Sequence, residues 1–292
     1  MDKNFNKGLL YTGLGSFWWG FIGVIYFKSI SFIGPYELVI HRSIWSTIML
    51  VITTFFFLKW KIFFEIIKNK RTLVYLFFSS LLIFINWAVW IYAVATERII
   101  DASFGYFIMP IISVFLGFIF FKEKINKKRL ISIILVSISI LFLLITNIQT
   151  LPWVGLIVAL SWGFYNLIRK KINVDTDIGI LIECLFIFPF VLVGFYLITI
   201  NGFNDFSLEN PSLNLYILLA GPMTVIPLLL YVKGVELCGL GPTGMVFYIT
   251  PTLQFLLGFF YYDELFSLTK MISFILIWIA VLIYLRDLYE TN

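Results

Sequence analysis

Long apolar stretches follow one another along almost the whole chain, separated by short segments that carry charges, proline or glycine. A helix needs about 20 apolar residues to cross the hydrocarbon core of a bilayer, and each stretch has about that length. The 292 residues hold ten such stretches and leave no room for a sizeable soluble domain. Only 13% of the residues are charged, against about 25% in ordinary soluble domains. The pattern therefore predicts an all-α polytopic membrane protein.

We expect ten transmembrane helices. They fall near residues 8–28, 35–58, 72–95, 102–121, 130–146, 151–168, 178–200, 213–232, 243–262 and 268–286. The apolar run at the N-terminus continues to Phe27 without a small-residue cleavage site, so we interpret it as the first span and not as a signal peptide.

Basic residues are distributed unevenly between the predicted loops. With the N-terminus in the cytoplasm, 17 of the 21 Lys and Arg residues lie in cytoplasmic loops or at cytoplasmic helix ends. Because basic residues concentrate on that side of a membrane, both termini are predicted to be cytoplasmic. The same bias explains the net charge of +5, which therefore does not indicate nucleic-acid binding. We expect the lipid bilayer to surround the chain and no nucleic acid to be a partner.

The two halves of the sequence resemble each other. A shift of 141 residues lays YFIMPIISVFLGFIFFKEK, which begins at Tyr106, over FYITPTLQFLLGFFYYDEL, which begins at Phe247. A nearly equal shift aligns the Trp-Gly pairs of SFWWGF and LSWGF. We therefore predict a duplication, with one repeat at residues 8–146 and a second at 151–286.

Each predicted repeat has five spans, and an odd number places the second copy upside down relative to the first. Inverted repeats are typical of transporters whose halves rock around a central site, which is called alternating access. The shift aligns Pro110 with Pro251, and these prolines are our candidates for gating because each interrupts the hydrogen bonding of its helix. Glu123 and Glu264 end the same two spans, and we expect them to cap or pair with loops.

Ionisable side chains within the spans are few, and each costs about 2.5 to 3.5 kcal/mol at the centre of a transmembrane helix. Arg42 and Glu183 align under the same shift. We expect Arg42 to contact a carboxylate or another polar group of a substrate, and Glu183 to contact an amine or to bind a transported proton. The alternative is that both only fix packing. His41, the single histidine, is a second candidate for proton coupling, although we favour a hydrogen-bonded packing role.

Further candidate substrate-binding residues offer large aromatic faces or an uncharged amide. The aromatic candidates are Trp19, Trp87, Trp162, Tyr165, Tyr106 and Tyr248. Asn86 lies among apolar residues in the third span, so its amide should face a cavity or another helix. Asn166 and Gln254 are weaker polar candidates. The alternative is that these aromatic residues form an interfacial belt or pack between helices, because both use the same residue types as an aromatic cavity.

Several motifs resemble one known family over nearly the whole chain. They include SFWWGFIGVIYFK, ELVIHRSIWS, INWAVWIYAV, ASFGYFIMP with LGFIFFKE, and LPWVGLIVALSWGFYNLIRKKI. GPMTVIPLL, FYITPTLQFLLGFFYYDE and FILIWIAVLIY continue the resemblance. The sequence is similar to the EamA-type drug/metabolite transporters and, among them, to the RarD subgroup. The resemblance implies two five-helix EamA repeats, a bacterial inner membrane and movement of small metabolites or drugs, usually outward.

The sequence thus predicts a carrier that exports small amphipathic metabolites or drugs, with a proton as an optional co-substrate. A channel or facilitator-type pore and a lipid scramblase are the alternatives. We expect no enzyme, because the chain has no GxSxG, HExxH or multi-His motif, and no ATPase, because it has no P-loop. One histidine and two cysteines, Cys184 and Cys238, predict neither a metal site nor a cofactor. The identity of the substrate and the direction of transport stay open.

Overall fold

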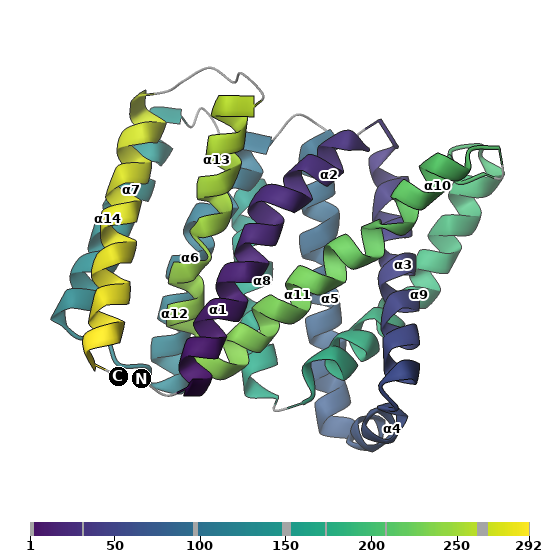
Figure 1. Cartoon of the computed structure of the whole chain (residues 1–292), viewed down its shortest axis with the longest axis horizontal. Coiled ribbons are helices and arrows are strands. Elements are labelled where there is room, and N and C mark those ends of the chain that lie inside the picture. Colours follow the sequence, from purple (N-terminus) through teal and green to yellow (C-terminus); the bar gives the residue numbers. More distant parts are fainter. Residues whose placement is uncertain are drawn as a thin grey trace.

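The computed structural model describes residues 3–30, 32–95, 99–147, 153–172, 174–207, 209–261 and 268–291. Every regular element in these ranges is a helix, and no strand occurs there. The helices form an elongated bundle, and the N- and C-termini lie at the same end of it (Figure 1). We call this end the terminal end and the opposite one the far end.

The first half of the chain, up to residue 147, contains eight elements. They are α1 (Lys3–Phe17), the π-helix η1 (Trp18–Ile22), α2 (Gly23–Ser29), α3 (Pro35–Phe56), α4 (Trp60–Lys68), α5 (Lys70–Ala95), α6 (Ile99–Phe121) and α7 (Lys127–Asn147). The second half contains α8 (Trp153–Lys171), α9 (Thr176–Ile200), α10 (Pro211–Leu218), α11 (Ala220–Cys238), α12 (Leu240–Val246), α13 (Ile249–Tyr261) and α14 (Leu268–Thr291). Over the described residues, each of the ten predicted spans is mainly helical.

Six helical stretches of the described chain are both long enough and apolar enough to cross a bilayer, which makes this a multi-pass membrane protein. They are Lys3–Ser29, Pro35–Phe56, Lys70–Ala93, Thr176–Ile200, Pro211–Cys238 and Met271–Glu290. A shorter apolar helix covers Gly105–Phe121. Helix α8 is more polar because three consecutive basic residues end it, and α13 has only 13 residues.

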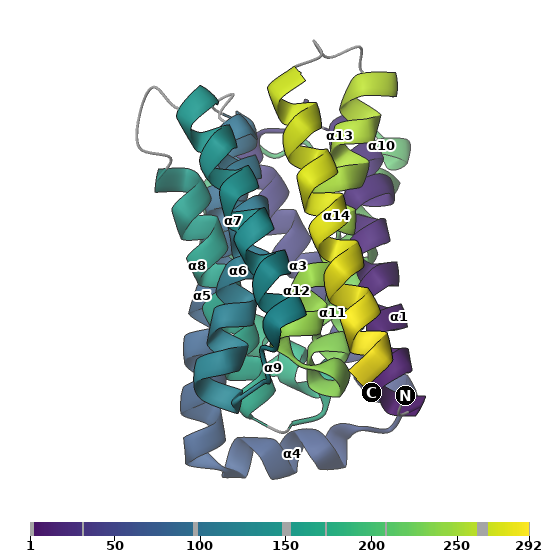
Figure 2. The same ribbon diagram turned by 90° about the vertical axis from the view of Figure 1, so that its left-hand side faces the viewer.

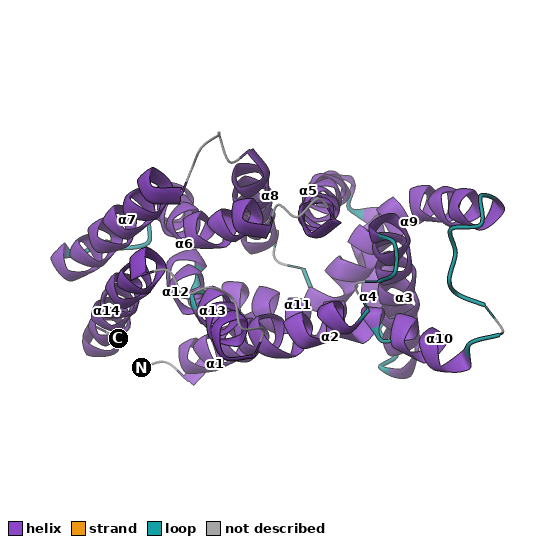
Figure 3. Cartoon of the chain, turned by 90° about the horizontal axis from the view of Figure 1, so that it is seen from above, coloured by secondary structure: helices purple, strands orange, loops and turns teal. Residues whose placement is uncertain are grey.

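Helices from the two halves pack against each other throughout the bundle. Seen from above, α3 lies beside α9 at one side of the molecule and α7 beside α14 at the other, with α1, α5, α8 and α11 between them (Figure 3). Helix α6 runs toward the terminal end, whereas α12 and α13 run away from it (Figures 1 and 2). Helix α6 and the α12–α13 segment, which the 141-residue shift aligns, therefore run in opposite directions.

Glycines allow two of these inter-half contacts to be close. A Cβ atom on Gly105 of α6 would lie 2.6 Å from the carbonyl oxygen of Gly155 in α8. A Cβ atom on Gly221 of α11 would lie 2.6 Å from the carbonyl oxygen of Trp45 in α3. Close backbone approach at small residues is a main source of helix association in membranes, where the hydrophobic effect between helices is absent.

Helix α4 was not among the predicted elements. It lies across the terminal end of the bundle (Figure 2), and none of its residues is buried. Phe63 and Ile67 face the bundle, while Lys61 and Lys68 supply charge on the polar side. The sequence WKIFFEIIK has the periodicity of an amphipathic helix, so this pattern could have revealed α4 before the structure did.

Two breaks in regular α-helix lie near the centre of the bundle. The π-helix η1 interrupts the first long helix at Trp18–Ile22, and wide turns of this kind often occur at functional sites. Between α12 and α13 the chain turns at Phe247 and Tyr248. Pro251 has no N–H to donate to the Phe247 carbonyl four residues earlier, which accounts for this break. Pro110, by contrast, lies inside the continuous helix α6.

Candidate functional site

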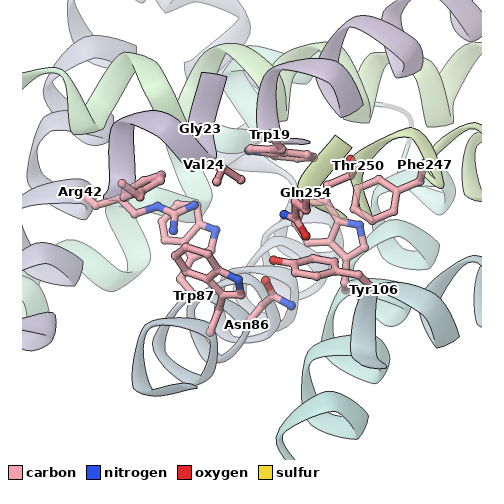
Figure 4. Close-up of a pocket in the computed structure, with 13 residues that line it drawn as sticks. Trp19, Gly23, Val24, Arg42, Asn86, Trp87, Tyr106, Phe247, Thr250 and Gln254 are labelled. Atoms are coloured by element: carbon pink, nitrogen blue, oxygen red, sulfur yellow. The ribbon is translucent and has the colours of Figure 1, made fainter. Parts of the chain in front are cut away.

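A cavity lies between the two halves of the bundle. It encloses about 630 Å³ of space between atoms, including its open mouth. The residues that line it come from η1, α2, α3, α5, α6, α8, α13 and the turn before α13. They are Trp19, Gly23, Val24, Phe27, Arg42, Asn86, Trp87, Trp90, Tyr106, Trp162, Phe247, Thr250 and Gln254 (Figure 4).

The exposure of the lining residues shows which way the cavity faces. Phe27 in α2 and Trp90 near the end of α5 are partly exposed and lie toward the far end. Trp162 and Phe247, deeper in the bundle, are buried at 6% and 1% exposure. Tyr165 and Tyr231, which are 0% exposed, pack in the same hydrophobic core as Trp162 and Phe247, and Tyr165 lies one turn farther along α8 toward the terminal end.

Arg42 brings a positive charge to one end of the cavity. Its guanidinium carbon lies 4.6 Å from the ring centre of Trp87 and 5.4 Å from that of Phe27. Its Nε atom is buried and has no hydrogen-bond partner among the described residues. The contacts with the two rings are cation–π interactions, each worth about 0.5 to 2 kcal/mol, which is less than the several kcal/mol that burial of an ion costs. The arginine is therefore only partly compensated by the protein.

Neutral polar groups and aromatic rings form the rest of the wall. Asn86 donates its amide N–H groups to the carbonyl oxygen of Val158 at 3.0 Å and to Ser161 Oγ at 3.1 Å. These bonds fix its orientation and leave its carbonyl oxygen as the group it can offer to a solute. Gln254 lies with Tyr106 at the end of the cavity opposite Arg42 (Figure 4).

Four aromatic side chains make this opposite end a rigid apolar slot. Trp19 packs edge-on against Trp162, with ring centres 5.3 Å apart, and against Phe247 at 6.3 Å. Tyr106 lies 5.9 Å from Phe247. Edge-to-face packing of this kind holds each ring in place and leaves flat faces for a planar solute.

Glu183 lies outside the cavity, in a buried cluster nearer the terminal end. Ser79 donates a hydrogen bond to its Oε1 at 2.5 Å, and Tyr165 donates to its Oε2 at 3.1 Å. Arg169 Nη1 lies 3.5 Å from Glu183 Oε1, and both side chains are almost fully buried. Arg169 also donates to the carbonyl oxygen of Thr176 at 3.0 Å. The structure thus pairs Glu183 with a buried arginine, and sequence reasoning had assigned that arginine only to a cytoplasmic helix end.

The two other predicted tyrosines are arranged as follows. Tyr165 is fully buried, stacks on Trp162 and bonds to Glu183, so it connects the cavity wall to the ionic cluster. Tyr248 donates its hydroxyl to the carbonyl oxygen of Phe107 at 2.8 Å and packs away from the cavity.

His41 lies beside the loop before α10, away from the cavity. Its Nε2 is 3.3 Å from Glu37 Oε1 and 3.2 Å from Asn204 Oδ1, both of which are acceptors. Nε2 must therefore carry the proton that is shared between them. Nδ1 is buried without a partner among the described residues, which suits a neutral ring because a second N–H would be unpaired. The main-chain N–H of Asp205 also donates to Glu37, so His41 and Glu37 hold this loop on α3.

A group of buried polar atoms beside the cavity makes no well-aligned hydrogen bond within the described part of the chain. It consists of Trp162 Nε1, both amide atoms of Asn166 and the hydroxyl of Tyr231, and we call it the polar cluster. The hydroxyl of Tyr231 lies within reach of Trp162 and Asn166, but these contacts lack full hydrogen-bond geometry. Asn166 and Tyr231 are both fully buried. Tyr231 was not singled out from the sequence, although the 141-residue shift aligns it with Trp90, which lines the cavity.

The prolines and glutamates of the aligned motif have different surroundings. Pro110 and Pro251 are buried, in α6 and at the start of α13 respectively. Glu123 accepts hydrogen bonds from the main-chain N–H groups of Leu240 and Gly241, both at 2.8 Å, and so caps the start of α12. The expected capping role of Glu123 is confirmed. Glu264 lies outside the described residues.

Ion pairs join several helices at the terminal end. Lys59 Nζ lies 3.1 Å from Asp175 Oδ1 and 2.8 Å from Asp177 Oδ1, which ties the end of α3 to the start of α9, and we call this the latch. Burial lowers the pKa of Lys59, but hydrogen bonds and the charges of the two aspartates outweigh it and raise the pKa overall. Burial raises the pKa of Asp175, but hydrogen bonding to Asp177 and Lys59 prevails and lowers it. Lys170 adds a bond to the carbonyl oxygen of Glu236 in α11.

Comparison with known proteins identifies relatives over the full length of this fold. An uncharacterized transporter of Bacillus subtilis, YojE, is 35% identical, with 95% of this chain and 93% of that protein covered. Protein RarD of Escherichia coli is 33% identical, with 99% and 97% covered. A solved crystal structure shares the fold at a TM-score of 0.69 and 13% identity, covering 95% of this chain and 96% of the other.

The EamA-like transporter family matches twice, at residues 6–145 and 151–286. The two matches together cover nearly the whole sequence, and they agree with the resemblance in its motifs. The relatives are named transporters, or RarD proteins, and not enzymes. With its apolar helices and this family match, the chain is a multi-pass membrane protein and belongs to the EamA-like transporter family.

Proposed function

We propose that this protein is a carrier that moves small amphipathic metabolites or drugs out of the cell by alternating access. The observation that carries the proposal is the cavity at the centre of the bundle, which both halves of the chain line. Arg42, Asn86 and Tyr106 come from the first half, and Trp162 and Gln254 from the second. A site shared by two halves changes shape when one half moves against the other, which is what a carrier requires.

The two halves, residues 8–146 and 151–286, would be inverted five-helix repeats with ten spans in total. The double match to the family and the opposite directions of α6 and α12–α13 support this arrangement. Pro110 sits in an unbroken helix while its counterpart Pro251 sits beside a break. In alternating access the two repeats adopt different conformations in turn, so one repeat would have a straight helix while the other has a broken one. The two prolines are therefore reasonable hinge positions.

The terminal end would face the cytoplasm of a bacterial cell. Lys127, Lys128 and Arg129 begin α7 at this end, and Arg169, Lys170 and Lys171 end α8 there. Such a concentration of basic residues favours the cytoplasmic side of the inner membrane. In the conformation described here, the cavity would then face outward, with the latch and the Arg169–Glu183 pair closing the cytoplasmic side.

The polar cluster indicates where an inward-facing cavity would form. The shift that aligns the Trp-Gly pairs lays Trp162 over Trp19 and Asn166 over Gly23, and the 141-residue shift lays Tyr231 over Trp90, so the cluster corresponds to positions that line the outward-facing cavity. Burying these polar groups with poorly aligned partners costs up to about 1 to 3 kcal/mol each. Opening the cytoplasmic side would hydrate them, which brings the two conformations closer in free energy.

Substrate contacts in this proposal fall to Arg42 for a polar head, to Asn86 for a hydrogen bond, and to Trp19, Trp87, Trp162 and Tyr106 for an apolar body. Tyr165 and Tyr248 are farther from the solute and would act through packing. Proton coupling through Glu183 stays a prediction, and it would require the ion pair with Arg169 to separate during the cycle. A proton on His41 would instead alter how the loop before α10 is held.

An efflux experiment on a mixture of solutes tests the proposal. Purified protein is reconstituted into liposomes that are loaded with a bacterial metabolite extract, and the external medium is analysed by mass spectrometry over time. We expect a small set of solutes to leave faster than from protein-free liposomes, with rates that saturate as their concentration rises. Indiscriminate, non-saturating release would indicate a pore, and transfer of labelled lipid between leaflets without solute efflux would indicate a scramblase.

A further inference from the structure

Among the residues placed around the cavity, Arg42 is the only one with a charged side chain. Among the described residues of the lining, none of the others carries a carboxylate, an imidazole or an amine. The two rings beside Arg42, Trp87 and Phe27, interact with the guanidinium through their faces and supply no negative charge. The empty cavity therefore presents one uncompensated positive charge.

The acidic residue that the sequence aligns with Arg42 does not balance this charge. Glu183 already has a buried partner in Arg169 and accepts hydrogen bonds from Ser79 and Tyr165. These three partners occupy both carboxylate oxygens, and Glu183 is 1% exposed. A solute in the cavity therefore meets a cation at one end and no anion to receive an ammonium group.

We infer that the transported solute is a small organic anion with a flat apolar body and no positive charge. This inference rests on the proposed carrier function. A carboxylate or a similar oxyanion would bind Arg42, and a planar body would lie between Trp19, Tyr106 and Phe247 at the other end of the cavity (Figure 4). Zwitterionic amino acids and cationic drugs would bind poorly, since each places an unpaired ammonium in a positive site.

The expected preference is large because the hydrogen bonds are charge-assisted. A guanidinium forms two parallel hydrogen bonds with a carboxylate, and neutral head groups cannot reproduce them. Hydrogen bonds to charged groups are worth enough to change affinity about 10- to 100-fold. A carboxylate should therefore bind at least about tenfold more tightly than the matching amide.

An anionic solute also has a consequence for the energetics of export. Bacterial membranes are negative inside, and each 100 mV multiplies the equilibrium outside-to-inside ratio of a monoanion about 50-fold. Outward transport of such a solute would need neither ATP nor a coupled proton. The lack of a proton-accepting side chain among the lining residues agrees with this mode of transport.

The test compares four probes that share one ring and differ in the head group. They are phenylacetate, phenylacetamide, phenylalanine and phenethylamine, which are respectively anionic, neutral, zwitterionic and cationic. Their affinities for the full-length protein in lipid nanodiscs are measured by isothermal titration calorimetry. We expect phenylacetate to bind at least about tenfold more tightly than each of the others.

Two variants and one control link the preference to Arg42. Arg42→Gln should reduce the affinity for phenylacetate to that for phenylacetamide, and Arg42→Lys should keep part of the preference because the charge remains. Arg286→Gln is the matched control, since it removes a positive charge from an exposed position on α14. It should leave all four affinities unchanged. Size-exclusion chromatography confirms that each variant is folded.

Each outcome decides the inference separately from the carrier function. Equal or tighter binding of phenylalanine or phenethylamine, or failure of all four probes to bind at millimolar concentration, would overturn the anion inference. The carrier function would still stand if the metabolite efflux described above is saturable. Efflux of labelled phenylacetate from proteoliposomes should accelerate when a potassium gradient with valinomycin makes the interior negative. An unchanged rate would contradict electrogenic anion export.

Discussion

Replacement of Glu183 by glutamine isolates the buried charge of Arg169. Glutamine has nearly the same shape but only one acceptor oxygen, so it keeps one of the hydrogen bonds from Ser79 and Tyr165 and donates its NH2 group to the other hydroxyl. The main change is therefore the loss of a negative charge. Arg169 then has no counter-ion at its buried end, and its Nε and Nη1 atoms already lack hydrogen-bond partners among the described residues. Removing one partner of a buried ion pair costs about 3 to 5 kcal/mol, so Glu183→Gln should lower the free energy of unfolding by that amount.

A second substitution measures the pair itself. Arg169→Met in the Glu183→Gln background removes the isolated charge, and an apolar replacement of a whole buried pair is often close to neutral. We expect the double variant to recover most of the stability, which gives a coupling free energy of several kcal/mol in a double-mutant cycle. Arg42→Gln should not lower stability and should raise it, because its partners among the described residues are the rings of Trp87 and Phe27, which do not offset the cost of burying its charge.

Unfolding of the purified protein by SDS in mixed micelles, followed by tryptophan fluorescence, provides these free energies by linear extrapolation. The reasoning would be refuted if Glu183→Gln were as stable as the wild type. If that variant were also inactive in transport, Glu183 would take part in substrate or proton binding, as the sequence suggested, and the ion pair with Arg169 would be secondary.

Three further predictions concern the polar cluster, a close helix contact and the latch. Tyr231→Phe should change stability by less than about 1 kcal/mol in the SDS assay, because the hydroxyl makes only poorly aligned contacts with Trp162 and Asn166, and a larger loss would show that these contacts are full hydrogen bonds. Gly221→Ala should reduce the yield of folded protein, since its Cβ would meet the Trp45 backbone at 2.6 Å, whereas Gly34→Ala, with nothing within 4 Å, should not. The raised pKa of Lys59 and the lowered pKa of Asp175 both favour the charged forms of these two groups near neutral pH. Because thiol reactivity itself rises with pH, labelling of a cysteine behind the latch is divided by that of an exposed cysteine at the same pH. This ratio should not change near neutral pH, and a transition there would contradict the reasoning.

Much of the fold follows from hydrophobicity because a bilayer imposes length and helicity on each span. The helix bounds agree with the sequence to within a few residues for most spans, and Pro35 and Pro211 mark helix starts that proline favours. Helix α4 was missed because a search for long apolar runs does not detect a short amphipathic helix. Its alternation of apolar and charged residues at helical spacing was nevertheless present in the sequence.

The candidate site was only partly predictable. A charged or amide side chain within an apolar span can be identified from the sequence because burying it is costly. Arg42 and Asn86, which were identified in this way, line the cavity. The partner of Glu183 could not be read from the sequence, because Arg169 lies among three basic residues at a helix end where the positive-inside rule already explains it. Only the structure, in which the Arg169 side chain approaches Gly179 and Glu183 of α9, shows that this arginine is buried. The polar cluster was likewise invisible, since the absence of well-aligned hydrogen bonds is a property of the packed structure.

Alternating access can be tested most directly by cysteine labelling on both sides of the cavity, after Cys184 and Cys238 are replaced by serine. Val24→Cys reports opening toward the far end, and Asn166→Cys reports opening toward the terminal end. Breaking the latch with Lys59→Ala should increase labelling of Asn166→Cys by an impermeant thiol reagent from the cytoplasmic side, and decrease labelling of Val24→Cys from the other side. A simultaneous increase at both positions, or access to Asn166→Cys only from the far end, would contradict a carrier with two exclusive openings.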